Sequence, residues 1–133
     1  MIFFIGFSIT DIYGKSYNLA DFNSYIILDF WATWCAHCDE ELDKLNKEFY
    51  NDSLFKVVAI SLDTKRDVEK IKQIAKSRNW NFIISIDEGK KIASKYGIVG
   101  LPTVVILDKN LKVKKKITGY HPNLLELIRK AVK

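Results

Sequence analysis

The chain has 133 residues and a net charge of +5, and 48% of its residues are hydrophobic, with 13% aromatic. A chain of this length and composition can bury a core of its own, which argues against intrinsic disorder. No segment approaches the roughly 20 consecutive apolar residues that cross a bilayer, so we expect residues 1–133 to form one globular domain.

The start of the chain, residues 1–7, is apolar but lacks the basic region and the small-residue cleavage site of a signal peptide. We interpret it as a leading strand or as the cut end of a longer chain. In the second case an export signal or a membrane anchor would lie upstream of Met1, so a membrane-associated protein stays open.

Strand-like and helix-like segments alternate along the rest of the chain. Their patterns predict strands at residues 7–10, 16–17, 25–31, 55–61, 82–85, 103–107 and 113–118, and helices at residues 36–50, 64–78, 87–97 and from 122 onward. Thr64 with Asp67, and later Asp87, suit helix starts, and Gly97 suits a helix end. This order predicts an α/β sandwich with a mixed central sheet, parallel in its first part and ending in an antiparallel hairpin.

A cluster of lysines surrounds the last predicted strand: Lys109, Lys112, Lys114, Lys115 and Lys116. Such a cluster could bind an acidic partner, but lysines also solvate a strand and discourage edge pairing. Because charge bears on solubility before it bears on function, we favour the second interpretation and expect no nucleic-acid partner.

The only two cysteines of the chain, Cys35 and Cys38, stand three residues apart between a predicted strand and a predicted helix. This spacing brings their side chains close enough for a disulfide. The helix start favours a thiolate, the nucleophile of thiol–disulfide exchange. We predict that Cys35 is the exposed attacking thiol and that Cys38, on the apolar helix face, is the buried resolving thiol.

A zinc site is the other interpretation of a cysteine pair at this spacing. Only His37 and His121 remain as soft ligands, and no second paired motif follows. A single C-x-x-C pair in a chain of this size is typical of a redox motif, so we expect no metal and no cofactor.

Two polar residues near the pair are candidates for catalytic roles. His37 can donate to the Cys35 thiolate and so make the disulfide a better oxidant, although an exposed histidine without a role is the alternative. Asp29 interrupts an apolar strand, where a carboxylate is costly unless it is paired or protonated. We predict that Asp29 lies behind the dithiol and accepts the Cys38 proton; a structural acid bound to a lysine is the alternative.

Two tryptophans, Trp31 and Trp34, flank the pair, and we expect them to cover it. Pro102 precedes a predicted strand, and from the sequence alone it is a turn proline.

The chain resembles the thioredoxin superfamily, in particular the TlpA/ResA branch of membrane-facing thiol–disulfide oxidoreductases. Residues 30–35 followed by Cys38 are similar to the active-site signature of this branch, and residues 96–103 to its second signature. Residues 7–22 resemble its N-terminal hairpin, and residues 63–82 resemble its extra helix and strand. The resemblance covers nearly the whole chain and implies a thioredoxin-like fold.

The resemblance also implies roles for single residues. Pro102 would be a cis-proline packed against the dithiol, and Leu101 would pair with a bound peptide. We add Trp34 and Ala36 as candidate substrate contacts. Asp29 matches the buried acid of thioredoxin itself.

The chain departs from the pattern of the branch in two places. His37 stands where the branch usually has proline, which resembles disulfide isomerases and periplasmic oxidases instead. No proline follows Cys38 within the predicted helix. The first departure leaves the direction of electron flow open, because related scaffolds span about 150 mV in reduction potential.

We therefore predict a thiol–disulfide oxidoreductase that exchanges a Cys35–Cys38 disulfide with a client protein, in cytochrome c maturation or in extracytoplasmic disulfide reduction. It would need an upstream thiol–disulfide electron donor or acceptor. We expect a monomer and favour an extracytoplasmic location, with the cytoplasm as the alternative. Two other functions stay open: a peroxiredoxin-like peroxidase and a non-catalytic peptide-binding module. The peroxidase is disfavoured because Ala32 stands where that class has a threonine.

Overall fold

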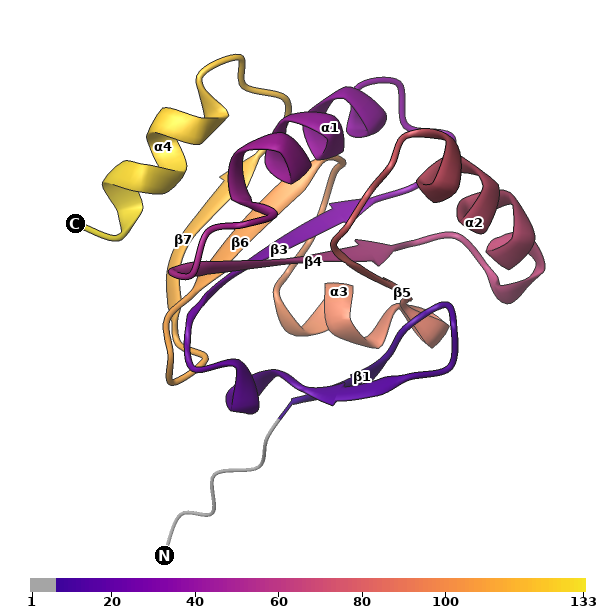
Figure 1. The fold of residues 1–133 in the computed structure, drawn as a ribbon, viewed down its shortest axis with the longest axis horizontal. Coiled ribbons are helices and arrows are strands. Elements are labelled where there is room, and N and C mark those ends of the chain that lie inside the picture. Colours follow the sequence, from indigo (N-terminus) through magenta and orange to yellow (C-terminus); the bar gives the residue numbers. More distant parts are fainter. Residues whose placement is uncertain (1–6) are drawn as a thin grey trace, which may run out of the picture.

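The computed structural model describes residues 7–133 (Figure 1). Its strands are β1 (Ser8–Thr10), β2 (Ser16–Asn18), β3 (Tyr25–Trp31), β4 (Phe55–Ser61), β5 (Ile83–Ile86), β6 (Thr103–Leu107) and β7 (Val113–Thr118). Its α-helices are α1 (Cys38–Phe49), α2 (Val68–Ser77), α3 (Lys91–Lys95) and α4 (Leu124–Ala131), and its 3-10 helices are η1 (Leu19–Phe22), η2 (Lys65–Asp67) and η3 (Glu88–Lys90). Within this part of the chain, no helix is long and apolar enough to cross a membrane. The leading strand considered for the apolar start falls mostly on residues 1–6, outside the described residues.

The central sheet has five strands in the order β5-β4-β3-β6-β7. β3, β4 and β5 are parallel, whereas β6 runs antiparallel to both β3 and β7. β1 and β2 form a separate antiparallel pair. The predicted mixed sheet with an antiparallel hairpin at its end is therefore confirmed.

Helices cover both faces of this sheet (Figure 1). Successive residues of a strand point to opposite faces, so Ile27 and Trp31 of β3 join a core with α1, α2 and α4. Ile26 and Phe30 join a second core with α3 and the β1–β2 hairpin. Because β3 is buried on both faces, the end of β3 and the start of α1 are held in fixed positions.

The starts of α1 and α3 differ from the predicted ones for identifiable reasons. α1 begins at Cys38 rather than at residue 36, because the chain first makes a turn in which the Cys38 N–H donates to the Cys35 carbonyl (3.4 Å). Asp87 does not cap the residues that follow it directly. Instead, Gly89 and Lys90 adopt positive φ angles of 66° and 55°, and the Asp87 carboxylate accepts the N–H groups of Ile92 and Ala93 at the start of α3 (2.9 and 2.8 Å).

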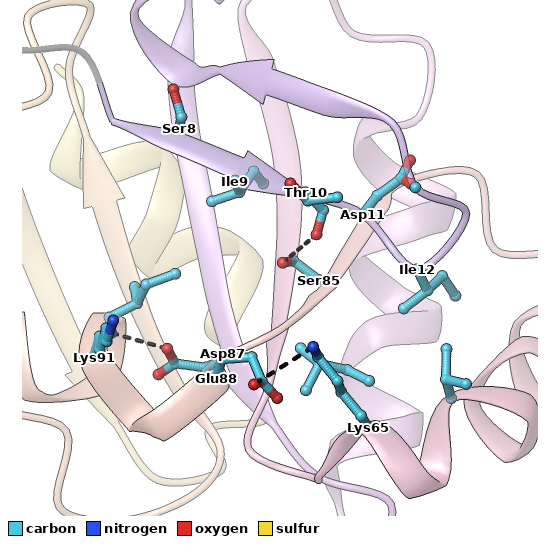
Figure 2. A pocket seen from close by; sticks show the side chains of 14 residues that line it. Ser8, Ile9, Thr10, Asp11, Ile12, Lys65, Ser85, Asp87, Glu88 and Lys91 are labelled. Atoms are coloured by element: carbon cyan, nitrogen blue, oxygen red, sulfur yellow. Dashed lines mark hydrogen bonds and ion pairs between the residues drawn. The ribbon is translucent and has the colours of Figure 1, made fainter.

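A cavity of about 860 Å³ lies between the β1–β2 hairpin, the end of β5 and the starts of α2 and α3 (Figure 2). Ser85 of β5 donates to the Thr10 carbonyl beside it (2.7 Å), which ties the hairpin to the sheet. The lining includes Lys65, Glu88 and Lys91 but no residue of the cysteine motif. This cavity is therefore separate from the predicted redox site.

Candidate active site

The two cysteines form a disulfide at the start of α1, with their Cα atoms 5.5 Å apart. Cys35 lies in the turn before the helix and is half-buried, whereas Cys38, the first residue of α1, is 0% exposed. The Cys35 N–H donates to the Ala32 carbonyl (3.1 Å), which fixes the turn. Cys35 is therefore the more exposed of the two cysteines, as expected from the sequence, and the attacking and resolving roles stay predictions.

The predicted substrate contacts differ in exposure. Trp34 is 71% exposed, and Ala36 is exposed as well. The peptide bond between Leu101 and Pro102 is cis; Leu101 is half-buried and Pro102 is buried. These residues lie in the two segments that the sequence motifs singled out, and their roles in binding stay predictions.

The expectation that Trp31 covers the site is wrong. Trp31 is 0% exposed, and its ring meets the edge of Trp80 at a centroid distance of 5.5 Å. As the last residue of β3 it points into the core beneath α1. Of the two tryptophans, Trp34 therefore offers an exposed aromatic surface and Trp31 supports the turn from below.

A buried carboxylate, Asp63, holds the segment before the cysteines in place. The backbone N–H and the hydroxyl of Thr33 donate to its two carboxylate oxygens (2.9 and 2.8 Å). The Ser61 hydroxyl also donates to Asp63 (2.7 Å). The contacts join the end of β4 to the turn that presents Cys35.

We expect Asp63→Ala to lower the free energy of unfolding by about 2–3 kcal/mol, because hydrogen bonds to a charged group are worth about 1.5–3 kcal/mol and their donors would be left unpaired. Urea unfolding of the oxidised protein measures this change. Asp67→Ala is the matched control, since Asp67 belongs to an exposed capping box with Thr64 and its loss should cost about 1 kcal/mol. Equal effects of the two substitutions would contradict the role given to Asp63.

The Asp29 side chain is 0% exposed on the sheet face beneath α1, and neither of its oxygens has a hydrogen-bond donor among the described residues. Its neighbour is a second buried carboxyl group, Glu41, which is 1% exposed. Burial raises the pKa of Asp29 well above its usual range, and the neighbouring Glu41 carboxyl group raises it further. Burial and the neighbouring Glu41 thus favour a proton on this carboxyl pair, and no lysine of the described residues pairs with Asp29.

Burial also raises the pKa of Glu41, against the lowering effects of the neighbouring Asp29 and of the charges of His121 and Lys44. Glu41 follows Cys38 by three residues on α1, and residues at this spacing are neighbours on one helix face. The carboxyl pair therefore begins one helical turn from the buried cysteine.

The sequence interpretation missed Glu41. The apolar stripe of α1, which contains Cys38, Leu42 and Leu45, is its buried face, and the sequence interpretation gave Glu41 beside it no role. The available signal was its position beside that stripe, three residues after Cys38. A carboxyl group there is buried as soon as the helix packs on β3.

The structure records no hydrogen bond of the His37 side chain within the described residues. The imidazole instead stacks on the ring of Tyr120, with centroids 4.7 Å apart and an interplanar angle of 23°. Tyr120 lies in the connection between β7 and α4. His37 is exposed at the start of α1, so the predicted effect on Cys35 stays a prediction.

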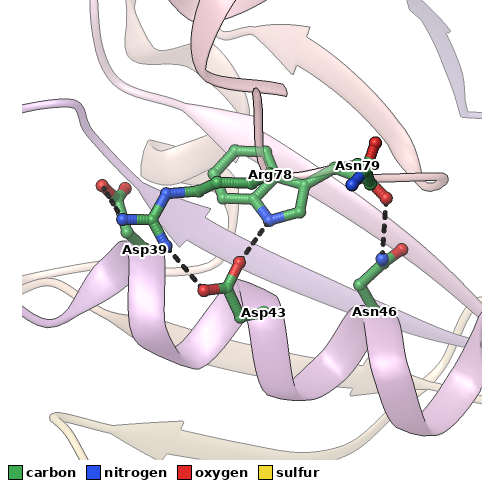
Figure 3. A network of polar contacts seen from close by, with 6 residues as sticks. Asp39, Asp43, Asn46, Arg78 and Asn79 are labelled. Atoms are coloured by element: carbon green, nitrogen blue, oxygen red, sulfur yellow. Dashed lines mark hydrogen bonds and ion pairs between the residues drawn. The ribbon is translucent and has the colours of Figure 1, made fainter. Parts of the chain in front are cut away.

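A polar network ties the first turns of α1 to the segment after α2 (Figure 3). Arg78 forms ion pairs with Asp43 (2.6 Å) and Asp39 (3.5 Å). The Trp80 indole N–H donates to Asp43 (2.8 Å). These contacts fix the start of α1, and with it Cys38, relative to α2 and the segment that follows α2.

A family model described as the AhpC/TSA family matches residues 4–116. The chain belongs to this family. A thiol-disulfide oxidoreductase ResA from Bacillus thuringiensis subsp. konkukian (strain 97-27) is 34% identical over 116 residues, which are 85% of this chain and 66% of the relative. The thioredoxin-like protein YneN from Bacillus subtilis (strain 168) is 36% identical over 108 residues, or 77% of this chain and 62% of the relative. The chain thus spans slightly less than two thirds of the length of these curated relatives.

Solved structures agree with this assignment. A DsbE-type thiol:disulfide interchange protein from Chlorobium tepidum has a TM-score of 0.81 and 27% identity, and the match covers 97% of this chain and 92% of the other. StoA from Bacillus subtilis, at 21% identity and a TM-score of 0.77 over 98% of both chains, shows the likeness of the fold. The thioredoxin-like fold and the resemblance to ResA-type oxidoreductases, both inferred from the motifs, are confirmed.

Proposed function

We propose that the chain is a thiol–disulfide oxidoreductase that exchanges its Cys35–Cys38 disulfide with client proteins. The observation that carries the proposal is the pairing of a reachable Cys35 with a fully buried Cys38 one turn away, next to a buried carboxyl pair. Such an arrangement separates the attacking sulfur from the resolving sulfur. The similarity to ResA relatives supports the same activity.

In the reducing direction, the Cys35 thiolate attacks a client disulfide and forms a mixed disulfide, and one client sulfur leaves as a thiolate. Cys38 then loses its proton to the carboxyl pair of Asp29 and Glu41, and its thiolate attacks the Cys35 sulfur. The second client thiolate leaves, and the Cys35–Cys38 disulfide closes. Two electrons have passed to the client, so an upstream dithiol must reduce the protein again. In the oxidising direction the same steps run in reverse.

The location of the protein and its class of client are proposed from the resemblance to the TlpA/ResA branch. It favours a client outside the cytoplasm, such as an apocytochrome c whose cysteines must be reduced before haem attachment. Trp34 and Ala36 on one side of Cys35, and Leu101 with Pro102 on the other, would contact the client as an extended peptide.

The residues directly before Cys35 do not favour the peroxidase alternative. Ala32 occupies the third position before it, and the hydroxyl of the nearby Thr33 is committed to Asp63 (2.8 Å). A measurement of hydrogen peroxide consumption with a thiol donor distinguishes the two activities.

Trapping of the mixed disulfide tests the proposal. Reduced Cys38→Ser protein, mixed with an unfolded protein that contains a disulfide, is expected to accumulate a covalent adduct through Cys35, because the resolving thiol is gone. Non-reducing electrophoresis and mass spectrometry detect the adduct and its site. Cys35→Ser is the control and should form none. Wild-type protein that consumes peroxide but reduces no client disulfide would contradict the proposal.

A further inference from the structure

The segment that follows β7 touches both halves of the candidate active site. The Gly119 N–H donates to the carbonyl of Pro102 (2.8 Å), on the cis-proline side. The next side chain, Tyr120, stacks on His37 between the two cysteines. Gly119 has a φ of +86°, in the left-handed region that favours glycine, and this turn directs Tyr120 toward α1.

The hydroxyl end of the Tyr120 side chain also contacts α1. Its hydroxyl oxygen accepts a hydrogen bond from the Lys44 ammonium (3.1 Å), and that ammonium lies 5.3 Å from the ring centroid. A hydrogen bond with Tyr120 also lowers the pKa of Glu40, one turn before Lys44 on α1. The phenol therefore contacts α1 at its hydroxyl group, through Lys44, as well as at its ring face, through His37.

Sequence reasoning gave Tyr120 no role, and the reaction steps proposed above do not use it. Yet it is the recorded aromatic partner of His37, the residue that replaces the usual proline of the motif. A side chain in an exposed turn has several rotamers of similar energy. A stacked aromatic pair is worth about 0.5–1.5 kcal/mol beyond area burial, which is enough to select one of them.

We propose that Tyr120 is a positioning residue that holds the His37 imidazole in the orientation in which it acts on the Cys35 sulfur. The inference rests on the proposed thiol–disulfide exchange. Through Tyr120, the connection between β7 and α4 would contribute to the redox equilibrium without touching either sulfur.

A double-mutant cycle tests this inference. The four proteins are wild type, Tyr120→Leu, His37→Ala and the double variant, and the measurement is the equilibrium constant of each with glutathione. We expect Tyr120→Leu to shift the equilibrium about two- to tenfold toward the disulfide form, as the energy of an aromatic pair allows. In the His37→Ala background the same substitution should have no effect.

Two control variants separate positioning from a general structural effect. Tyr120→Phe keeps the ring and should keep the wild-type equilibrium, although it removes the Lys44 contact. Tyr50→Leu alters a 65% exposed tyrosine at the far end of α1 and should also leave the equilibrium unchanged. Proton NMR provides a second readout: the His37 ring protons should lie upfield in wild type and in Tyr120→Phe, and return to ordinary positions in Tyr120→Leu.

Additive effects of the two substitutions on the equilibrium, or unshifted His37 ring protons in wild type, would overturn the inference while disulfide exchange itself continues. If none of the four proteins exchanges with glutathione, the proposed function fails instead. The two failures are therefore distinct.

Discussion

Replacing both buried carboxyl groups, in the variant Asp29→Asn with Glu41→Gln, is expected to slow resolution of the mixed disulfide by about 100-fold or more. General acid–base catalysis by a positioned side chain contributes about 10²–10⁴-fold to a rate, and Asp29 and Glu41 are the most deeply buried carboxyl groups of the described residues, at 0% and 1% exposed. Stopped-flow measurement of client release from a preformed Cys35 adduct gives the rate of this step. Each single substitution should have a smaller effect, because the remaining carboxyl group still accepts a proton.

The pH dependence of the resolution rate tests the same proton-acceptor role. Because burial and Glu41 raise the pKa of Asp29, the pair keeps its shared proton at pH values where an ordinary carboxyl group has lost its own. The fraction of the pair able to accept the Cys38 proton therefore grows as the pH rises through the raised pKa. We expect the wild-type resolution rate to increase with pH over this range, and the double variant to lose that increase.

Asp39→Asn is the matched control for these carboxyl variants. Asp39 adjoins Cys38 in the sequence, but its side chain forms an ion pair with Arg78 (3.5 Å) rather than facing β3. It should therefore leave the resolution rate nearly unchanged. A double variant that resolves its adduct as fast as wild type, while remaining folded by circular dichroism, would contradict the proton-acceptor role.

The sequence predicted the sheet well because its strands carry unambiguous local signals. The apolar run that became β3, and the matching run that became β4, have no helical spacing and are bounded by turns. The start of α1 was less well predicted, because the hydrogen bond from the Cys38 N–H to the Cys35 carbonyl competes with helix formation over residues 36 and 37. Such competition depends on the turn geometry and has no periodic signal.

The residues of the candidate site were predictable where a single segment of the sequence gives the signal. Cys35 and Cys38 were recognised from their spacing, and Asp29 from the cost of a carboxylate in an apolar strand. Glu41 and Tyr120 were not, because their roles depend on packing between α1 and segments distant in the sequence: β3 for Glu41, and the turn after β7 for Tyr120. Trp31 was misplaced because the strand pattern does not tell whether the last residue of β3 points outward or into the core.

Replacing the histidine between the cysteines, in His37→Pro, is expected to make the protein more reducing by about 30–60 mV, which is a ten- to hundredfold change in the equilibrium with glutathione. The imidazole stands at the helix start beside the turn that contains Cys35, and there it favours the thiolate of the reduced form. Its removal destabilises the reduced form and so favours the disulfide. Redox titration against glutathione, followed by tryptophan fluorescence, measures the shift.

Proline at residue 37 requires a moderate shift of the backbone. The His37 φ of −105° departs moderately from the value near −65° that proline requires. The His37 N–H also donates no recorded hydrogen bond among residues 7–133. His37→Ala separates the imidazole from the rigidity of proline: if the imidazole sets the potential, both variants shift in the same direction, and proline adds a smaller increment. A potential that rises in His37→Pro would contradict the role given to the imidazole. A potential that stays unchanged in both variants would show that the helix start alone stabilises Cys35 and that the departure from the usual proline has no redox consequence.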